Sequence, residues 1–183
     1  MEPKSKIITD KDQFLVLMPL MAKFPKIHNN LKSDFDLLIE ITEQQKTDTS
    51  QFRTLCRACL SNLFSVIEAD IFYFNLFDKY DEYYDKHHFL DKFKNTYKQI
   101  CKTWDREDLQ KEYFSSKLED LKALKTLRDK LLHPKEIEDL IEPSFDDFEK
   151  IKHVFQDYEK FFLTIMSNFF FNIQIPFDEI YPA

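Results

Sequence analysis

Apolar residues recur every three or four positions along most of this chain, which is the spacing that gathers them on one face of an α-helix. The longest such segment runs from about Gln51 to Lys79, and its apolar positions cover most of a helix circumference. Only a narrow stripe remains polar, and it contains Arg57, Ser61, Ser65, Glu68 and Asn75. We therefore expect this segment to be the central helix of a helical bundle, with the largest buried area.

Two shorter helices are predicted before the central one. The first covers residues 10–23 and carries Pro19, whose ring should kink or split it. After a break at Pro25, a second helix is expected from about Leu31 to Gln45. Residues 1–48 are therefore interpreted as a helical extension that packs on the rest of the domain.

Three helices are predicted after the central one, spanning His88–Trp104, Asp105–His133 and Ser144–Phe171. Asp105 is the expected N-cap of the second of these. Ser144 and Asp147 have the spacing of a capping box, which indicates the start of the third. We interpret residues 49–172 as the core of a single all-α domain and 173–183 as an irregular tail.

The stretch LEDLKALKTLRDKLLHP, residues 118–134, contains an arginine in an unusual position. Its apolar stripe is formed by Leu118, Leu121, Leu124, Leu127, Leu131 and Leu132. Arg128 falls almost at the centre of that stripe, and a guanidinium cannot be desolvated without partners for its donors. Five residues on, His133 precedes Pro134, whose ring should end the helix at the histidine. The helix therefore presents an Arg and a terminal His together.

Composition narrows the classes of fold and function. The chain has 183 residues, no glycine, and 43% hydrophobic residues, which excludes a disordered chain and makes tight hairpins and phosphate-cradling loops unlikely architectures. The formal net charge of −7 argues against a protein that coats nucleic acid by charge alone. A local basic strip on an acidic protein is still compatible with these numbers.

Localisation and oligomeric state follow from three further features. The charged start MEPKSKIITDKDQ has no apolar core of a secretory signal, and the apolar run Phe161–Ile175 is too short and too polar to span a bilayer. Three cysteines without an export signal predict free thiols in a reducing cytoplasm. The segment FFLTIMSNFFF, residues 161–171, is more apolar than one helix face can hide, which predicts a homodimer.

Arg128 followed by Asp129 and then by His133, with a trailing proline, resembles the active-site signature of the HEPN superfamily. In that family an arginine, a polar residue and a histidine four to six positions after the arginine lie at the end of a helix in a small bundle. The upstream segment LSNLFSVIEADIF also resembles the family, and the resemblance covers roughly residues 50–165. It implies an HEPN-like up-down helical bundle.

The resemblance also implies an activity, that of a metal-independent endoribonuclease of bacterial toxin or phage-defence type, without a cofactor. His133 would exchange protons with the ribose 2′-hydroxyl or the leaving 5′-oxygen, and Arg128 would stabilise charge on the phosphorane. A homodimer would bring two histidines together. Besides RNA, an antitoxin or other regulatory protein is an expected partner. Lys135 stands where some relatives carry a tyrosine, which argues against control by tyrosine modification.

Supporting residues are predicted around the pair. Geometry favours Asp70 as the carboxylate that meets Arg128, because it falls within the apolar side of the central helix, whereas the family resemblance favours Glu68. The lysines nearest the motif, Lys125, Lys130 and Lys135, would follow the RNA backbone. The competing interpretation is a solvated helix face and an ion-paired core arginine beside a helix-terminal histidine. The protein would then be a non-catalytic HEPN-like binding or oligomerisation module.

The remaining metal-ligand candidates give weak patterns. Cys56 and Cys59 form a Cys-x-x-Cys, but it lies within an apolar helical stripe and has no second ligand pair, so buried thiols are expected. His87 and His88 are adjacent and would point about 100° apart on a helix, which favours a solvated loop over a metal site. The isolated histidines His28 and His153 carry no functional signal.

Overall fold

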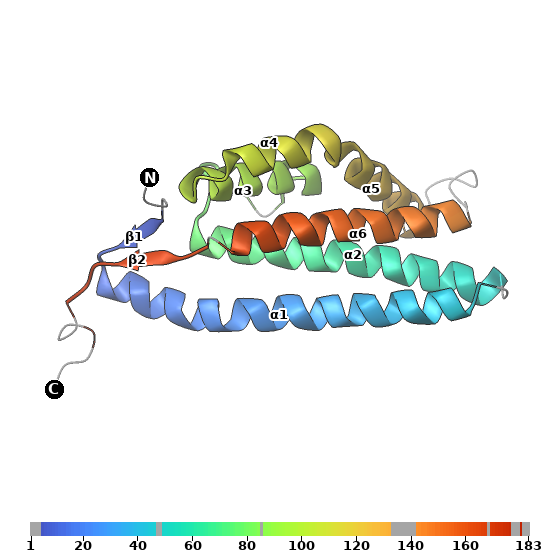
Figure 1. The fold of residues 1–183 in the computed structure, drawn as a ribbon, viewed down its shortest axis with the longest axis horizontal. Helices are drawn as coiled ribbons and strands as arrows, with labels where there is room; N and C mark the ends of the chain where they lie inside the picture. The colour runs from blue at the N-terminus through green and yellow to red at the C-terminus, as the bar shows by residue number, and fades with distance from the viewer. Residues whose placement is uncertain are drawn as a thin grey trace.

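The computed structural model describes residues 5–46, 49–84, 86–132, 142–167, 169–176 and 180. This part of the chain is almost entirely helical, as predicted (Figure 1). The elements in chain order are β1 Lys6–Ile8, α1 Lys11–Gln44, α2 Thr49–Phe77, α3 Phe89–Thr103, α4 Glu107–Ser116, α5 Leu118–Leu132, α6 Phe145–Met166 and β2 Phe171–Ile173.

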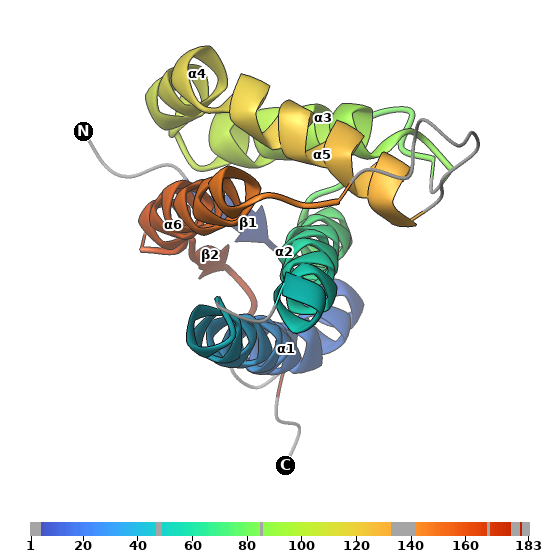
Figure 2. The ribbon, with the colours of Figure 1, turned by 90° about the vertical axis from the view of Figure 1, so that its right-hand side faces the viewer.

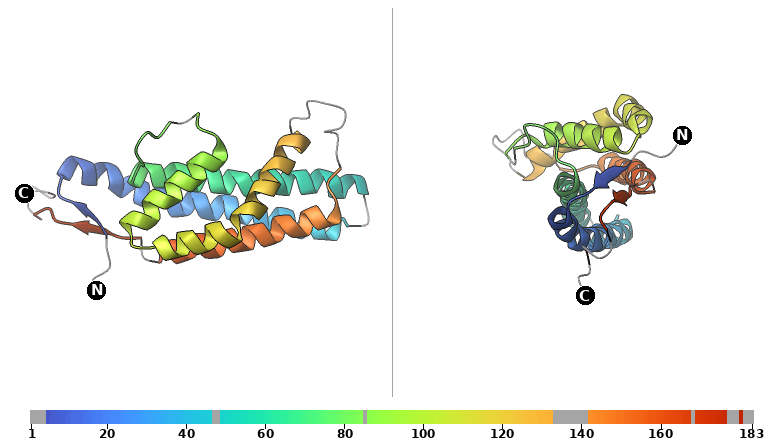
Figure 3. Two further views of the ribbon diagram at one scale, coloured as in Figure 1. Left: turned by 90° about the horizontal axis from the view of Figure 1, so that it is seen from above. Right: turned by 90° about the vertical axis from the view of Figure 1, so that its left-hand side faces the viewer.

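Three long helices, α1, α2 and α6, run side by side along the long axis of the molecule, and α3, α4 and α5 form a layer over α2 and α6 (Figures 1 and 2). Seen from above, α3 and α5 cross the long helices obliquely (Figure 3). The centre of the core is α2, which contributes the largest set of buried residues among the described elements, including Leu60, Leu63, Phe64, Ile67 and Phe74. The predicted central helix is therefore confirmed.

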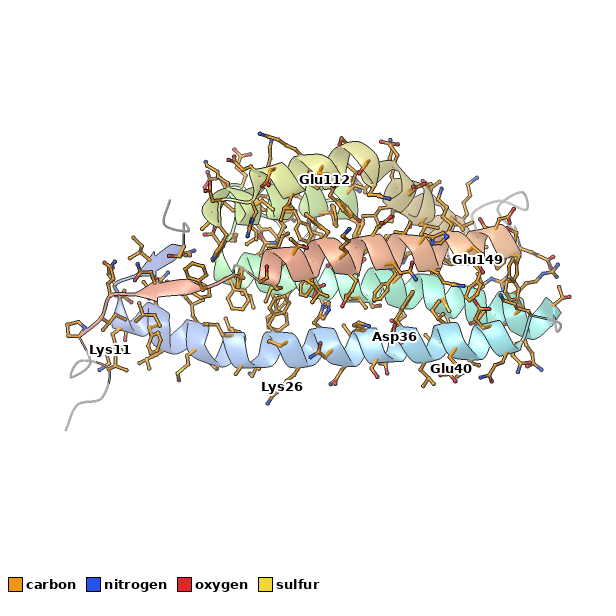
Figure 4. The ribbon with its side chains drawn as sticks, viewed as in Figure 1. Lys11, Lys26, Asp36, Glu40, Glu112 and Glu149 are labelled. Atoms are coloured by element: carbon orange, nitrogen blue, oxygen red, sulfur yellow. The ribbon has the colours of Figure 1, made fainter. Side chains whose placement is uncertain are left out.

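Helix α1 is one continuous helix, so the predicted division into two helices was wrong. Pro19 and Pro25 both lie inside it, on its exposed face. Leu17, Phe24 and Phe35 are buried on the opposite face. Because that buried face continues past both prolines, packing on α2 and α6 outweighs the roughly 3 kcal/mol that each interior proline costs a helix. The labelled Lys26 and Glu40 point outward from α1 (Figure 4).

The predicted helix from Asp105 to His133 is divided into α4 and α5, with the break at Lys117. Asp105 is not its N-cap, because it has a left-handed backbone with φ of 56° and belongs to the end of α3. The N–H of Arg106 donates to the carbonyl of Cys101 at 2.6 Å, which closes α3 in a Schellman motif. A chain without glycine uses aspartate here, one of the few other residues that tolerate this conformation.

The capping box at the start of α6 is confirmed. Ser144 Oγ accepts the backbone N–H of Asp147 at 3.1 Å, and Asp147 Oδ2 accepts the backbone N–H of Ser144 at 2.8 Å. Helix α6 ends at Met166, earlier than predicted. Beyond it, Phe169 stacks on Trp104 with ring centroids 4.3 Å apart, and the Trp104 indole N–H donates to the carbonyl of Phe170 at 2.8 Å.

One small feature departs from the predicted all-α domain, which was expected to contain no sheet. Strands β1 and β2 form a small parallel pair, with Lys6 opposite Phe171 and Ile8 opposite Ile173. The pair lies at one end of the bundle (Figure 1). Lys6 anchors it, since its ammonium donates to the carbonyl of Phe77 at 2.8 Å and to Asp78 at 2.5 Å. Three-residue strands are too short to show a clear alternation in sequence.

Most of the apolar segment 161–171 is accommodated within one chain. Phe161, Phe162 and Ile165 are buried, and only Leu163 and Phe170 among its large apolar residues are strongly exposed. The argument for a homodimer from this segment therefore loses its force. No helix in the described part of the chain combines the length and apolar character needed to cross a membrane.

Candidate functional site

Helix α5 packs on α2 and α6 through Leu118, Leu121 and Leu124, which are buried. Leu127 and Leu131 complete the stripe at its partly buried end. This packing directs Arg128 toward α2. The predicted apolar stripe is thus confirmed through Leu131, and the arginine lies where the stripe approaches the molecular surface.

Arg128 meets α2 through two contacts. Its Nη1 lies 3.2 Å from Glu68 Oε1, and its guanidinium carbon lies 5.2 Å from the centre of the Phe64 ring. Its side chain remains 23% exposed. Its Nε is buried and has no hydrogen-bond partner among the described residues. The guanidinium is therefore fixed by an acid and an aromatic face, and the donors that a ligand can reach are those of its exposed edge, not the buried Nε.

The carboxylate beside the arginine is Glu68, which the family resemblance favoured, and the geometric argument for Asp70 was wrong. Helix α2 is apolar nearly all round, so burial alone did not specify which of its neighbours each acidic residue meets. Glu68 is half-exposed, as the acid of an accessible site would be.

His133 and Lys135 lie outside the described residues. Helix α5 is described up to Leu132, so its last residue directly precedes the histidine. Arg128 is five positions earlier on the same helix.

Of the two described lysines near Arg128, one is already engaged in an ion pair and one is free to bind a polyanion such as RNA. Lys125 forms an ion pair with Asp129 one turn later, and this engages the supporting aspartate of the predicted motif. Lys130 is exposed and has no ion pair within the described part of the chain. The face is thus a mixed one, with less positive charge than the count of lysines suggests.

Asp70 belongs to a different, buried cluster that ties together four helices. His28 Nδ1 on α1 lies 3.0 and 3.1 Å from the two oxygens of Asp70 on α2. Tyr158 on α6 donates to Asp70 at 2.6 Å, and Tyr97 on α3 in turn donates to Tyr158 at 2.7 Å. The second ring nitrogen of His28 lies 3.3 Å from Glu159 Oε2.

The charges of this cluster stabilise one another. Burial, the largest influence on His28, lowers its pKa, but its contacts with Asp70 and Glu159 outweigh burial and raise the pKa from 6.5 to about 9. The imidazolium also stacks on the Phe162 ring, with centroids 4.0 Å apart. Burial raises the pKa of Asp70, and His28 and Tyr158 oppose that change.

The expectation that His28 is an isolated residue was therefore wrong, and the part it has in this cluster is structural. The available signal was its place on the buried face of a helix, four positions after Phe24 and seven before Phe35, where an unpaired imidazole would be costly. Sequence spacing correctly predicted that Asp70 is buried and needs a partner. It could not select a partner 42 residues away on another helix.

The cysteines have the predicted character, and the predicted solvated loop is confirmed for His88 only, because His87 is half-buried and its Nδ1 lies 3.3 Å from the hydroxyl of Tyr80. Cys56, Cys59 and Cys101 are buried free thiols, and burial raises the pKa of Cys56 and of Cys101 to about 12. His88 is exposed in the connector before α3. Across the described ranges, no group of three or more His, Cys, Asp or Glu side chains is arranged to hold a metal ion.

Comparisons with known proteins found no match: no family model, no curated protein and no solved structure is similar to this chain. The resemblance to the HEPN superfamily therefore depends on the sequence motif alone, that is, on residues of α2 and α5 and on His133 and Pro134 after them.

Proposed function

We propose that the protein is an HEPN-like, metal-independent endoribonuclease in which Arg128 and His133 act on the scissile phosphodiester. The observation that carries the proposal is the state of Arg128, which is oriented by Glu68 and Phe64 but keeps a partly exposed edge of its guanidinium. A purely structural arginine of this kind is usually surrounded by acceptors for its donors. Here the unused donors match a phosphate group.

The chemistry follows from the two side chains. The ribose 2′-oxygen attacks the adjacent phosphorus, and His133 as a base accepts the 2′-proton. The 5′-oxygen leaves with its bonding electron pair and takes a proton from an acid. Arg128 holds the equatorial oxygens as their charge increases, and Glu68 keeps the guanidinium in place. Asp129, paired with Lys125, limits rotation of the segment, while Lys130 and Lys135 attract the RNA backbone.

One histidine cannot be base and acid at the same moment, so we propose that two chains associate and that each supplies a His133. Cytoplasmic toxin or phage-defence activity, released from an antitoxin or other regulatory protein, is the context that fits such an enzyme. Light scattering that gives a species near 22 kDa at tens of micromolar protein would contradict the dimer and the two-histidine mechanism.

The direct test is an RNA cleavage assay in the presence of EDTA. The wild type should cleave RNA, and His133→Ala should not. His153→Ala is the matched control, because His153 is an exposed histidine on another helix. If all three proteins leave RNA intact while remaining folded and dimeric, the protein is the non-catalytic binding or oligomerisation module.

A further inference from the structure

A second, unrelated site lies between α4 and α6, under the helix layer that covers the bundle. It is a pocket of about 130 Å³, comparable in size with engineered cavities that accept one benzene ring. Its apolar wall is formed by Leu109 on α4 and Phe161 on α6. Its remaining lining residues are Glu112, Tyr113, Ser116, Lys117, Asp157, Lys160 and Thr164.

Tyr113 gives this pocket a buried hydrogen-bond donor. The residue is only 5% exposed, and its ring stacks on Phe161 with centroids 4.4 Å apart. Its hydroxyl is buried and has no hydrogen-bond partner among the residues that the structure describes. Burial, followed by the charges of Asp157 and Asp120, raises the pKa of this phenol, so it remains a neutral O–H donor. A buried donor without a partner is costly, and a bound acceptor would remove that cost.

The charges around the pocket are separated between its two sides. Lys117 and Asp157 neutralise one another at 2.9 Å. Two charged lining residues are left, Glu112 on α4 (labelled in Figure 4) and Lys160 on α6. Neither forms an ion pair within the described ranges. One anionic and one cationic side chain therefore line the same small cavity, one from each helix.

We propose that this pocket binds a free α-amino acid with a small branched apolar side chain. The ligand's carboxylate accepts from the hydroxyl of Tyr113 and pairs with Lys160, and its ammonium pairs with Glu112. Its side chain packs against Leu109 and the ring of Phe161. A simple carboxylic acid can pair only with Lys160, and a simple amine only with Glu112. The zwitterion pairs with both, so it is the species that the lining favours.

The test uses L-leucine with the full chain and follows binding by ligand-observed NMR titration. Two analogues of the same shape, 4-methylpentanoate and 3-methylbutylamine, each lack one charge and should bind on the order of 10-fold more weakly than leucine. Tyr113→Phe keeps the stacked ring and removes only the hydroxyl, and it should also weaken leucine binding about 10-fold. The matched control is Tyr84→Phe, which removes an exposed hydroxyl outside the pocket.

Two surface variants keep the proposal testable if Tyr113→Phe folds poorly. Glu112→Gln should erase the preference for leucine over the acid, and Lys160→Gln should erase its preference over the amine, while Lys26→Gln on the outer face of α1 changes neither. The proposal is wrong if leucine does not bind at tens of millimolar, if the three ligands bind the wild type equally, or if Tyr113→Phe binds leucine as the wild type does.

Discussion

Replacing His28 by alanine should destabilise the protein strongly and change how its stability depends on pH. The substitution removes a ring that contacts Asp70 at 3.0 Å and stacks on Phe162. It leaves the carboxylate of Asp70 buried, with the hydroxyl of Tyr158 as its remaining partner among these contacts. Removing one partner of a buried ion pair typically costs about 3–5 kcal/mol.

The pKa of His28 gives an independent value for the free energy by which the protonated ring stabilises the fold. Folding raises it from 6.5 to about 9, and about 1.36 kcal/mol per pH unit makes the protonated ring's contribution about 3 kcal/mol. Because the folded-state pKa is the higher one, this stabilisation is fully present below pH 6.5 and is lost as the pH rises through about 9. The two routes agree that the cluster is worth about 3 kcal/mol at neutral pH or below.

The assay is urea unfolding followed by circular dichroism at several pH values from 6 to 9. The wild type should lose about 3 kcal/mol of unfolding free energy over that range, and His28→Ala should start lower and lose much less. His153→Ala should stay within about 0.5 kcal/mol of the wild type and keep its pH dependence, because His153 is exposed. Equal pH dependence in His28→Ala and the wild type would refute the charged-cluster reasoning.

Four further outcomes are expected. Arg128→Ala should lower RNA cleavage by about 10²-fold or more with little change in melting temperature, whereas a loss of about 3–5 kcal/mol in urea unfolding would mark Arg128 as structural. Arg128→Lys keeps the charge but not the planar fork, so cleavage at the wild-type rate would exclude a phosphate clamp. Ser144→Ala should cost about 1 kcal/mol in the same urea assay, through loss of the α6 capping box. Pro25→Ala, at an exposed position inside α1, should raise the melting temperature, and a fall would show that the proline is adapted to its site.

Local signals predicted much of the fold. The Ser144 capping box and the apolar stripe of Leu118, Leu121 and Leu124 depend on residues within one or two turns, and both are confirmed. The sequence did not predict that α1 is continuous, because proline locally disfavours a helix interior. The packing that outweighs this cost comes from other helices and is not visible in the local sequence. The bond from Trp104 to Phe170 joins residues 66 apart, and no periodic pattern contains such a contact.

The candidate site, like the fold, was predictable from the sequence only in part. The position of Arg128 within an apolar stripe was visible in the sequence, and so was its need for an acid. The choice between Glu68 and Asp70 was not. They lie about 160° apart, on nearly opposite sides of a helix that is apolar almost all round, so the pattern did not show which side meets α5. The partner of Asp70 was decided by His28, whose helix the sequence divided in the wrong place.

The parallel pairing of β1 with β2 has a mechanical consequence. The polypeptide enters β1 at Lys6 and leaves β2 at Ile173. Because the two strands are parallel, these two points lie at opposite ends of the strand pair. A pulling force applied to the chain before Lys6 and after Ile173 is therefore directed along the strands. It loads their hydrogen bonds together in shear, rather than opening them one at a time, and the salt bridge from Lys6 to Asp78 transmits part of that load into α2. Tension along the polypeptide therefore loads this short strand pair first, and the helical bundle bears the full force only after the pair has separated.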